Sequence, residues 1–155
     1  MSRSQVMIRP AESGDLSVMA ALLAELFSIE QEFGVDAEKQ RRGLEQLSAS
    51  GRACLLAAEA GGRVVGMVSG QMVISTAEGG LSLWAEDLVV EPAWRGRGVG
   101  RMLMQALEDW ARQKGATRLQ LLADQNNRRG VEFHRHLGWR PTGMFCMRKK
   151  DQEEG

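Results

Sequence analysis

The chain has few cysteines and no excess of charge of either sign. Its 155 residues include two cysteines, Cys54 and Cys146, and 20 acidic side chains balance 20 basic ones. Two cysteines cannot build a disulfide framework, so both are expected to be reduced thiols. A formal net charge of zero lacks the positive field on which general nucleic-acid binding depends, so we expect no nucleic-acid partner.

Long apolar runs are also missing. No apolar stretch approaches the ~18 residues that cross a bilayer, so neither a membrane-spanning helix nor a membrane partner is expected. The opening residues MSRSQVMIRP contain no apolar core of a secretory signal, and a cytoplasmic location is therefore expected. The hydrophobic content of 43% is too high for a disordered chain. What remains is a globular protein whose length suits one domain, residues 1–150, followed by a polar tail at 151–155.

The hydrophobic pattern alternates between strand-like and helix-like segments. Helical spacing of apolar residues predicts helices after Asp15, after Asp36, from Val99 to Lys114 and from Asn127 to Leu137. Short apolar runs between turn residues predict strands at Val6–Arg9, Ala53–Glu59, Val64–Ile74, Leu81–Val90, Arg118–Ala123 and Gly143–Arg148. The expected fold is α/β, a single-domain mixed sheet of about six to seven strands with flanking helices.

The segment from Glu86 to Arg101 has the strongest functional pattern. An apolar strand runs into three glycines, Gly96, Gly98 and Gly100, which open the most regular helix. The first amides of a helix have no intrahelical partner and carry partial positive charge, so they receive phosphate groups well. Arginines with donors that fit phosphate oxygens flank the glycines: Arg95, Arg97 and Arg101. A plain strand-to-helix turn with solvated arginines explains the same residues equally well.

Two common nucleotide-binding motifs are absent from this segment. No Gly-Lys-Ser/Thr follows the glycines, which excludes a P-loop. The glycine spacing is not G-x-G-x-x-G, and the segment follows a late strand instead of opening the domain. The pattern therefore indicates a diphosphate cradle of another kind.

Residues 95–100, Arg-Gly-Arg-Gly-Val-Gly, resemble the R/Q-x-x-G-x-G/A signature of the GNAT family of acyl-CoA-dependent N-acetyltransferases. Residues 8–15 are similar to that family's first strand and helix, and residues 127–139 to its N-x-x-A-x-x-F-Y-x-x-x-G-F segment. Residues 84–92, Trp-Ala-Glu-Asp-Leu-Val-Val-Glu-Pro, most resemble the diamine acetyltransferase-like branch. The resemblance covers nearly the whole chain, except the residues between Phe27 and Ala53.

The resemblance implies the GNAT acyltransferase fold and acetyl-CoA as cosubstrate. It implies that the backbones of Leu88, Val89 and Val90 pair with the pantetheine amides like an added strand, and that Asn127 contacts the cofactor further along its arm. It places the diphosphate on one continuous segment: Arg95, Gly96, Arg97, Gly98, Val99, Gly100 and Arg101. It is compatible with a homodimer. The residues themselves show no metal-ligand spacing, so no metal is expected.

Acetyl transfer to an amine needs a base, since at pH 7 only about one lysine-like amine in a few thousand is neutral. The resemblance implies Glu86 as that base, acting directly or through water; a solvated strand-end carboxylate is the alternative. In a regular strand the side chain of Asp87 would point to the other face. A backbone N–H near Val90 is the natural donor to the oxyanion.

The general acid is where the match breaks. The family's usual tyrosine falls at His134, and the chain contains no tyrosine. A thiol with a pKa of ~8.5 needs little help to leave. His134, water or Cys146 are therefore all candidates to protonate the thiolate, and the other interpretation of His134 is a polar helix residue near the cofactor.

The leading functional hypothesis is an enzyme that transfers an acetyl group from acetyl-CoA to a small-molecule or peptide amine. The alternative is a catalytically weak acyl-CoA-binding or sensing module, which the missing tyrosine favours and Glu86 disfavours. Acetylation of protein N-termini is a third hypothesis. No motif in the sequence identifies the acceptor.

Overall fold

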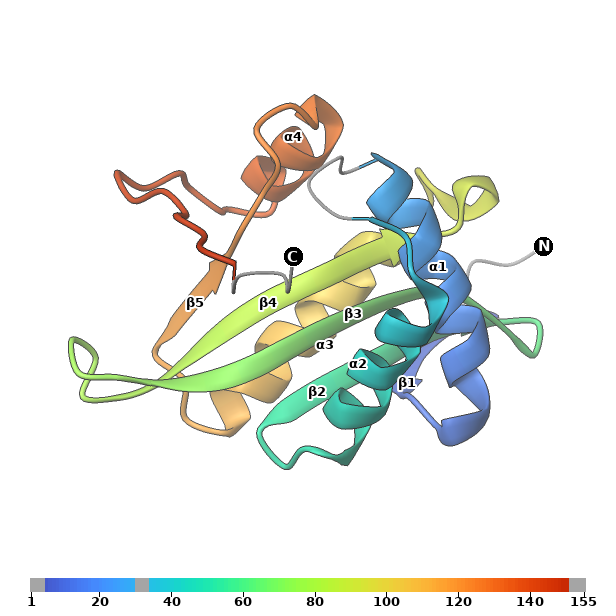
Figure 1. Cartoon of the computed structure of the whole chain (residues 1–155), viewed down its shortest axis with the longest axis horizontal. Helices are drawn as coiled ribbons and strands as arrows, with labels where there is room; N and C mark the ends of the chain where they lie inside the picture. The colour runs from blue at the N-terminus through green and yellow to red at the C-terminus, as the bar shows by residue number, and fades with distance from the viewer. Residues whose placement is uncertain (1–4, 30–33, 151–155) are drawn as a thin grey trace, which may run out of the picture. The chain divides into compact units, whose positions relative to one another are not determined.

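The computed structural model describes residues 5–29 and 34–150 (Figure 1). The chain forms two compact units, Met1–Leu121 and Leu122–Gly155. The expected polar tail at 151–155 lies outside the described residues. Among the described helices, none combines the length and the apolar character needed to cross a membrane.

The first unit is built on a five-stranded sheet with the order β1-β2-β3-β4-β5. The strands are β1 (Val6–Pro10), β2 (Ala53–Ala60), β3 (Arg63–Ser75), β4 (Gly80–Val90) and β5 (Arg118–Leu121). Neighbouring strands are antiparallel except for β4 and β5, which are parallel. A parallel pair needs a crossover, and helix α3 (Val99–Gln113) supplies it. This confirms the expected mixed α/β fold.

The hairpin between β2 and β3 turns at Gly61 and Gly62, and two adjacent glycines between two apolar runs are a sequence signal for such a turn. Both residues have positive φ, +58° and +76°. A two-residue hairpin turn with two positive φ values matches the twist of the strands that it joins, and glycine adopts it without steric cost. The turn brings β2 and β3 into a long antiparallel pair.

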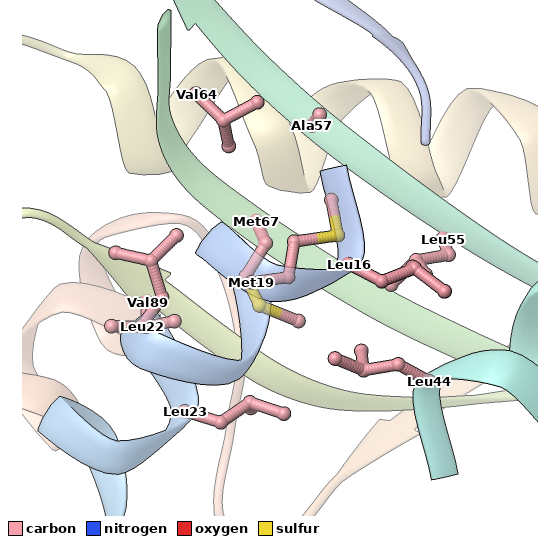
Figure 2. Close-up of a cluster of buried hydrophobic side chains, with 10 residues drawn as sticks. All are labelled: Leu16, Met19, Leu22, Leu23, Leu44, Leu55, Ala57, Val64, Met67 and Val89. Carbon is pink, nitrogen blue, oxygen red and sulfur yellow. The ribbon is translucent and has the colours of Figure 1, made fainter. Parts of the chain in front are cut away.

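Helices cover both faces of the sheet (Figure 1). Helices α1 (Leu16–Ile29) and α2 (Ala37–Ala49) pack on one face, where they enclose a core with β2, β3 and β4. Figure 2 shows this core, with Met19 of α1 and Leu44 of α2 facing Met67 of β3. On the opposite face, α3 presents Leu103 and Leu107 to the sheet, and both are fully buried. The sheet is therefore packed against helices on both of its faces.

The second unit contains one helix, α4 (Arg128–His136), within its described residues. Its N-cap is Asn127, whose side-chain oxygen accepts a hydrogen bond from the Gly130 N–H at 3.1 Å. The short helix expected from Asn127 to Leu137 is therefore present.

The strand expected at Gly143–Arg148 is wrong: this segment forms no strand. The described residues thus form five strands and not six to seven. The apolar side chains of residues 143–148 are not buried either, since Met144, Phe145 and Met147 are 87%, 78% and 84% exposed. A run of apolar residues expresses strand propensity, but a strand exists only where another strand pairs with its backbone.

Candidate active site

A bulge interrupts β4 at the position of the expected base. Ser69 pairs with Glu86 and Met67 pairs with Val89, so two residues of β4, Asp87 and Leu88, stand opposite one residue of β3. Asp87 has a φ of +52° and is the one described non-glycine residue with positive φ. An extra residue changes the face to which later side chains point.

The expectation for Asp87 assumed a regular strand, and the bulge shows that β4 is not regular at this residue. Ser69 and Met67 lie on the same face of β3, so their partners Glu86 and Val89 also share a face although three positions separate them. Val89 belongs to the core against α1. Glu86 therefore stands on the α1 face of the sheet, where it is exposed.

Two hydrogen bonds hold Glu86. The indole Nε1–H of Trp84, two residues earlier on β4, donates to Oε1 of Glu86 at 3.1 Å. The hydroxyl of Ser69, which is 1% exposed, donates to the backbone oxygen of Glu86 at 3.2 Å. Both the backbone and the carboxylate of Glu86 thus have a defined position.

Beyond the bulge, β4 has an unpaired edge. The parallel pairing with β5 runs from Ser82 to Ala85 and stops there. In the part of the chain that the structure describes, no strand pairs with the β5-facing edge of residues 86–90. These residues include Leu88, Val89 and Val90, the three expected to hold the pantetheine amides. An extended ligand with amide groups could add to this edge as a further strand.

The unpaired edge leads directly into the glycine-rich loop. Gly96 and Gly98 have φ values of +74° and +84°, and Gly98 is the N-cap of α3. No side chain caps this terminus, and its first turn has no acidic residue. The first amides of α3, those of Val99, Gly100 and Arg101, therefore have no intrahelical partner and face no competing carboxylate of their own helix. The space where a Cβ of Gly96 or Gly98 would lie is open.

The three arginines of the loop have different surroundings. Arg95 donates from Nε to the backbone oxygen of Val90 at 2.9 Å, and its Nη2 lies 3.7 Å from Oε1 of Glu25 on α1. The guanidinium of Arg97 lies over the ring of Trp94, 4.8 Å from its centroid. Arg101 is exposed in the first turn of α3. The loop thus presents exposed guanidinium groups beside unpaired amides, which fits a diphosphate.

The remaining expected site residues, Asn127 and His134, lie in the second unit, whereas Glu86 and the arginine loop lie in the first. The oxygen of Asn127 caps α4, as described above. His134 makes edge-on ring contacts with Phe133 at 5.3 Å and Trp139 at 6.2 Å. Its buried Nδ1 has no hydrogen-bond partner within the described residues. Burial lowers the pKa of His134 below its ordinary value of 6.5, so the neutral imidazole is favoured near pH 7.

The thiols differ sharply in their surroundings. Cys54 is buried in β2, and burial raises the pKa of its thiol from 9.0 to about 11. Cys146 is exposed, and both cysteines are free. A thiol with so high a pKa is a poor nucleophile at neutral pH, so Cys54 is unsuited to a covalent step. Among the described residues, no group of three or more histidine, cysteine or acidic side chains could hold a metal ion.

Sequence reasoning did not assign the residues that support the loop and the base. Trp84 and Glu86 are two positions apart in a strand, so their shared face was a usable signal. Ser69 and Glu25 lie far from Glu86 and Arg95 in the sequence. No local pattern could have identified these two, because their contacts depend on strand register and helix packing.

Comparison with known proteins finds relatives among acetyltransferases. Residues 19–139 match the model of the Acetyltransferase (GNAT) family. The chain is 29% identical to a thialysine N-epsilon-acetyltransferase of Bos taurus over 160 aligned positions, which cover 92% of this chain and 91% of the relative. It is 33% identical to streptothricin acetyltransferase of Streptomyces lavendulae over 79 residues, 51% of this chain and 42% of that relative.

Among solved structures, an aminoglycoside N-acetyltransferase in complex with CoA superposes with a TM-score of 0.81. The two chains are 20% identical, and the match covers 94% of each. At this identity the likeness concerns the fold, which is the one that the glycine-rich segment implied. The family model matches most of the chain, residues 19–139. The chain therefore belongs to the GNAT family of acetyltransferases.

Proposed function

We propose that this acetyl-CoA-dependent N-acetyltransferase acetylates a small-molecule primary amine by direct attack in a ternary complex, with Glu86 as the base. One observation supports this most: the unpaired edge of β4 begins at Glu86 and ends at Val90, and the loop that follows it leads to the uncapped N-terminus of α3. A base, an edge for amide pairing and an anion site thus follow one another along 16 residues, from Glu86 to Arg101.

Acetyl-CoA would lie along this path. Its diphosphate would contact the amides and side chains of the loop: Arg95, Gly96, Arg97, Gly98, Val99, Gly100 and Arg101. Its pantetheine amides would pair with the backbones of Leu88, Val89 and Val90. The Val90 carbonyl already accepts a hydrogen bond from Arg95, so the backbone and the loop would act on the cofactor as one unit. Asn127, from the second unit, remains a proposed contact.

The chemistry proceeds through a tetrahedral intermediate. The amine nitrogen attacks the thioester carbon, a C–N bond forms, and the amine proton passes to Glu86 directly or through water. A backbone N–H near Val90 stabilises the oxyanion. The C–S bond then breaks, and the thiolate of CoA takes up a proton. The products are the amide and CoA, and the carboxylate is regenerated when Glu86 returns its proton to solvent.

His134 is a proposed proton donor to the thiolate, and the lowered pKa of its imidazole constrains this role. A neutral imidazole is a weaker acid than an imidazolium. A thiol with a pKa of ~8.5, however, leaves as the thiolate with little assistance from an acid. If His134 is the acid, His134→Phe should lower kcat and alter the alkaline limb of its pH profile. An unchanged profile would leave water or Cys146 as the donor.

Relatives support a small amine as the acceptor. The similar proteins reported above are named for thialysine, streptothricin and aminoglycosides. The exposed carboxylate of Glu86 would also attract a cationic amine.

The function is tested by thiol release from acetyl-CoA in the presence of an amine panel: thialysine, an aminoglycoside and a peptide with a free N-terminus. Steady release with one of these amines is expected. Glu86→Gln should lower kcat by about tenfold or more, while calorimetry still detects acetyl-CoA binding. Binding without release for every amine would favour the acyl-CoA-sensing module. No heat of binding would contradict the proposed cofactor site.

A further inference from the structure

We propose that Trp84 is a positioning residue for the reaction: its indole N–H holds the carboxylate of Glu86 in the orientation that accepts the amine proton. The inference rests on the proposed role of Glu86 as the base. It goes beyond that role because it explains why a carboxylate on an exposed strand face would have a defined orientation. Trp84 would act through Glu86, without touching the reacting atoms.

The geometry of β4 makes this contact possible. Trp84 and Glu86 are separated by one residue, Ala85, so both side chains point to the α1 face before the bulge begins. The Nε1–Oε1 distance of 3.1 Å is that of a hydrogen bond to a carboxylate. Trp84 is half-buried and has two side-chain torsions, whereas exposed Glu86 has three. The less mobile side chain therefore limits the freedom of the more mobile one.

The backbone beneath Glu86 is independently held. Ser69, almost fully buried on β3, donates its hydroxyl hydrogen to the Glu86 backbone oxygen. With the main chain held by Ser69, mainly the side-chain torsions of Glu86 remain to be set, and the indole N–H restricts these. Oε1 accepts the indole hydrogen of Trp84, and the remaining lone pairs of the carboxylate are available to receive the amine proton.

This arrangement makes a specific kinetic prediction. Trp84→Phe keeps an aromatic ring and removes the N–H donor. Loss of one hydrogen bond to the base should lower kcat about two- to tenfold. The KM for acetyl-CoA should stay within about twofold, because Trp84 lies outside the proposed cofactor contacts. The matched control is Trp110→Phe, because Trp110 is also a half-buried tryptophan and lies on α3. This variant should retain the wild-type kcat.

A double-mutant cycle separates positioning from a general structural effect. In a Glu86→Gln background the base is gone, so adding Trp84→Phe should change kcat by less than about twofold. Assays use acetyl-CoA and the fastest amine of the panel above, and thermal unfolding verifies that each variant is folded. If Trp84→Phe lowers kcat by the same factor in both backgrounds, Trp84 acts independently of Glu86 and the inference is overturned.

A second readout does not depend on activity. In ¹⁵N-labelled protein, the indole N–H resonance of Trp84, assigned by elimination with Trp94→Phe, Trp110→Phe and Trp139→Phe, should move in Glu86→Ala, while that of Trp110 should not. An unmoved Trp84 resonance would overturn the inference even if Trp84→Phe fails to fold. The proposed function fails separately: if Glu86→Gln keeps wild-type kcat, Glu86 is not the base, whatever Trp84 contacts.

Discussion

Arg9 of β1 forms ion pairs with two carboxylates. Its two Nη atoms donate to the carboxylate of Asp15 at 2.7 and 3.1 Å, and its Nε donates to Glu59 of β2 at 2.9 Å. Asp15 also accepts a hydrogen bond from the Glu12 N–H at 2.7 Å. The network joins the first strand, the turn before α1 and the second strand. These interactions lower the pKa of Asp15, chiefly through the hydrogen bond from Arg9.

Asp15→Asn should lower the free energy of unfolding at pH 7 by about 1–2 kcal/mol, because the bidentate pairing to a partly buried arginine is lost. The folded state holds the Asp15 carboxylate at a pKa below its ordinary 3.8. The stabilisation is therefore complete well above pH 3.8 and disappears as the pH falls through the lower, folded-state pKa. Urea unfolding at several pH values measures this.

Glu45→Gln is the control for this prediction, since it breaks an exposed pair with Arg41 on α2. Such pairs contribute little, so a loss of no more than about 0.5 kcal/mol is expected. A difference between wild type and Asp15→Asn that persists unchanged at pH 2 would contradict the assigned ionic origin.

The left-handed backbone of Asp87 can be tested by asking which of two variants, alanine or glycine, is the more stable. Asp87→Ala and Asp87→Gly both remove the carboxylate, so comparing them isolates the backbone. In a regular strand alanine is more stable than glycine by roughly 0.5–1 kcal/mol. At a φ of +52° the order should reverse, with glycine more stable by about 1 kcal/mol. Equilibrium unfolding of both variants measures the difference, and an alanine variant as stable as the glycine variant would argue against the bulge.

At the scale of elements, local sequence patterns predicted those helices and turns that form through contacts between neighbouring residues. Helical periodicity and the glycines at Gly61 and Gly62 identified α1, α3 and the hairpin from neighbouring residues alone. The bulge in β4 was not predictable in this way. It depends on register with β3, and the residues on either side of Asp87 have an ordinary strand composition.

Glycines in two elements should respond oppositely to the same substitution. Gly70 of β3 faces α3, and a Cβ there would lie 2.7 Å from Leu107 Cδ1 and 2.8 Å from Leu83 Cδ1. Gly70→Ala should therefore cost about 1–3 kcal/mol through overpacking. Gly43 lies in α2, where a Cβ would meet nothing within 4 Å.

Gly43→Ala is the matched substitution and should stabilise the protein by about 0.5–1 kcal/mol, since alanine has the higher helix propensity. Chemical unfolding of both variants provides the measurement. If Gly70→Ala were neutral, the sheet and α3 would pack less closely than the structure shows.

At the scale of the whole molecule, the two units differ in how well their backbones are paired. The first unit has a continuous sheet with helices on both faces, whereas residues 143–148 of the second unit have apolar side chains in solvent and form no strand. Unpaired, exposed backbone opens more readily than a sheet.

Limited chymotrypsin digestion should therefore cut first after Phe145, which is 78% exposed, before any site in the sheet. Mass spectrometry of early time points identifies the bond, and Phe145→Ser should slow this first cut strongly. Phe27, half-buried beside the core, is the internal reference. Resistance of the Phe145 bond in the wild type would show that this segment pairs with a strand in solution.

The amino-acid sequence alone was sufficient to predict most of the secondary structure and the family. Apolar periodicity specified most helices and strands, and the run from Glu86 to Arg101 identified the family, because a strand, a glycine turn and a helix start are all built from adjacent residues. Long-range contacts settled the rest: the register that creates the bulge at Asp87, the point where β5 stops pairing with β4, the engagement of Arg95 by Glu25, and the absence of a strand at 143–148. Each of these features depends on contacts between residues that are far apart in the sequence. Their free energies are therefore set by strand register and helix packing, which form only in the folded chain.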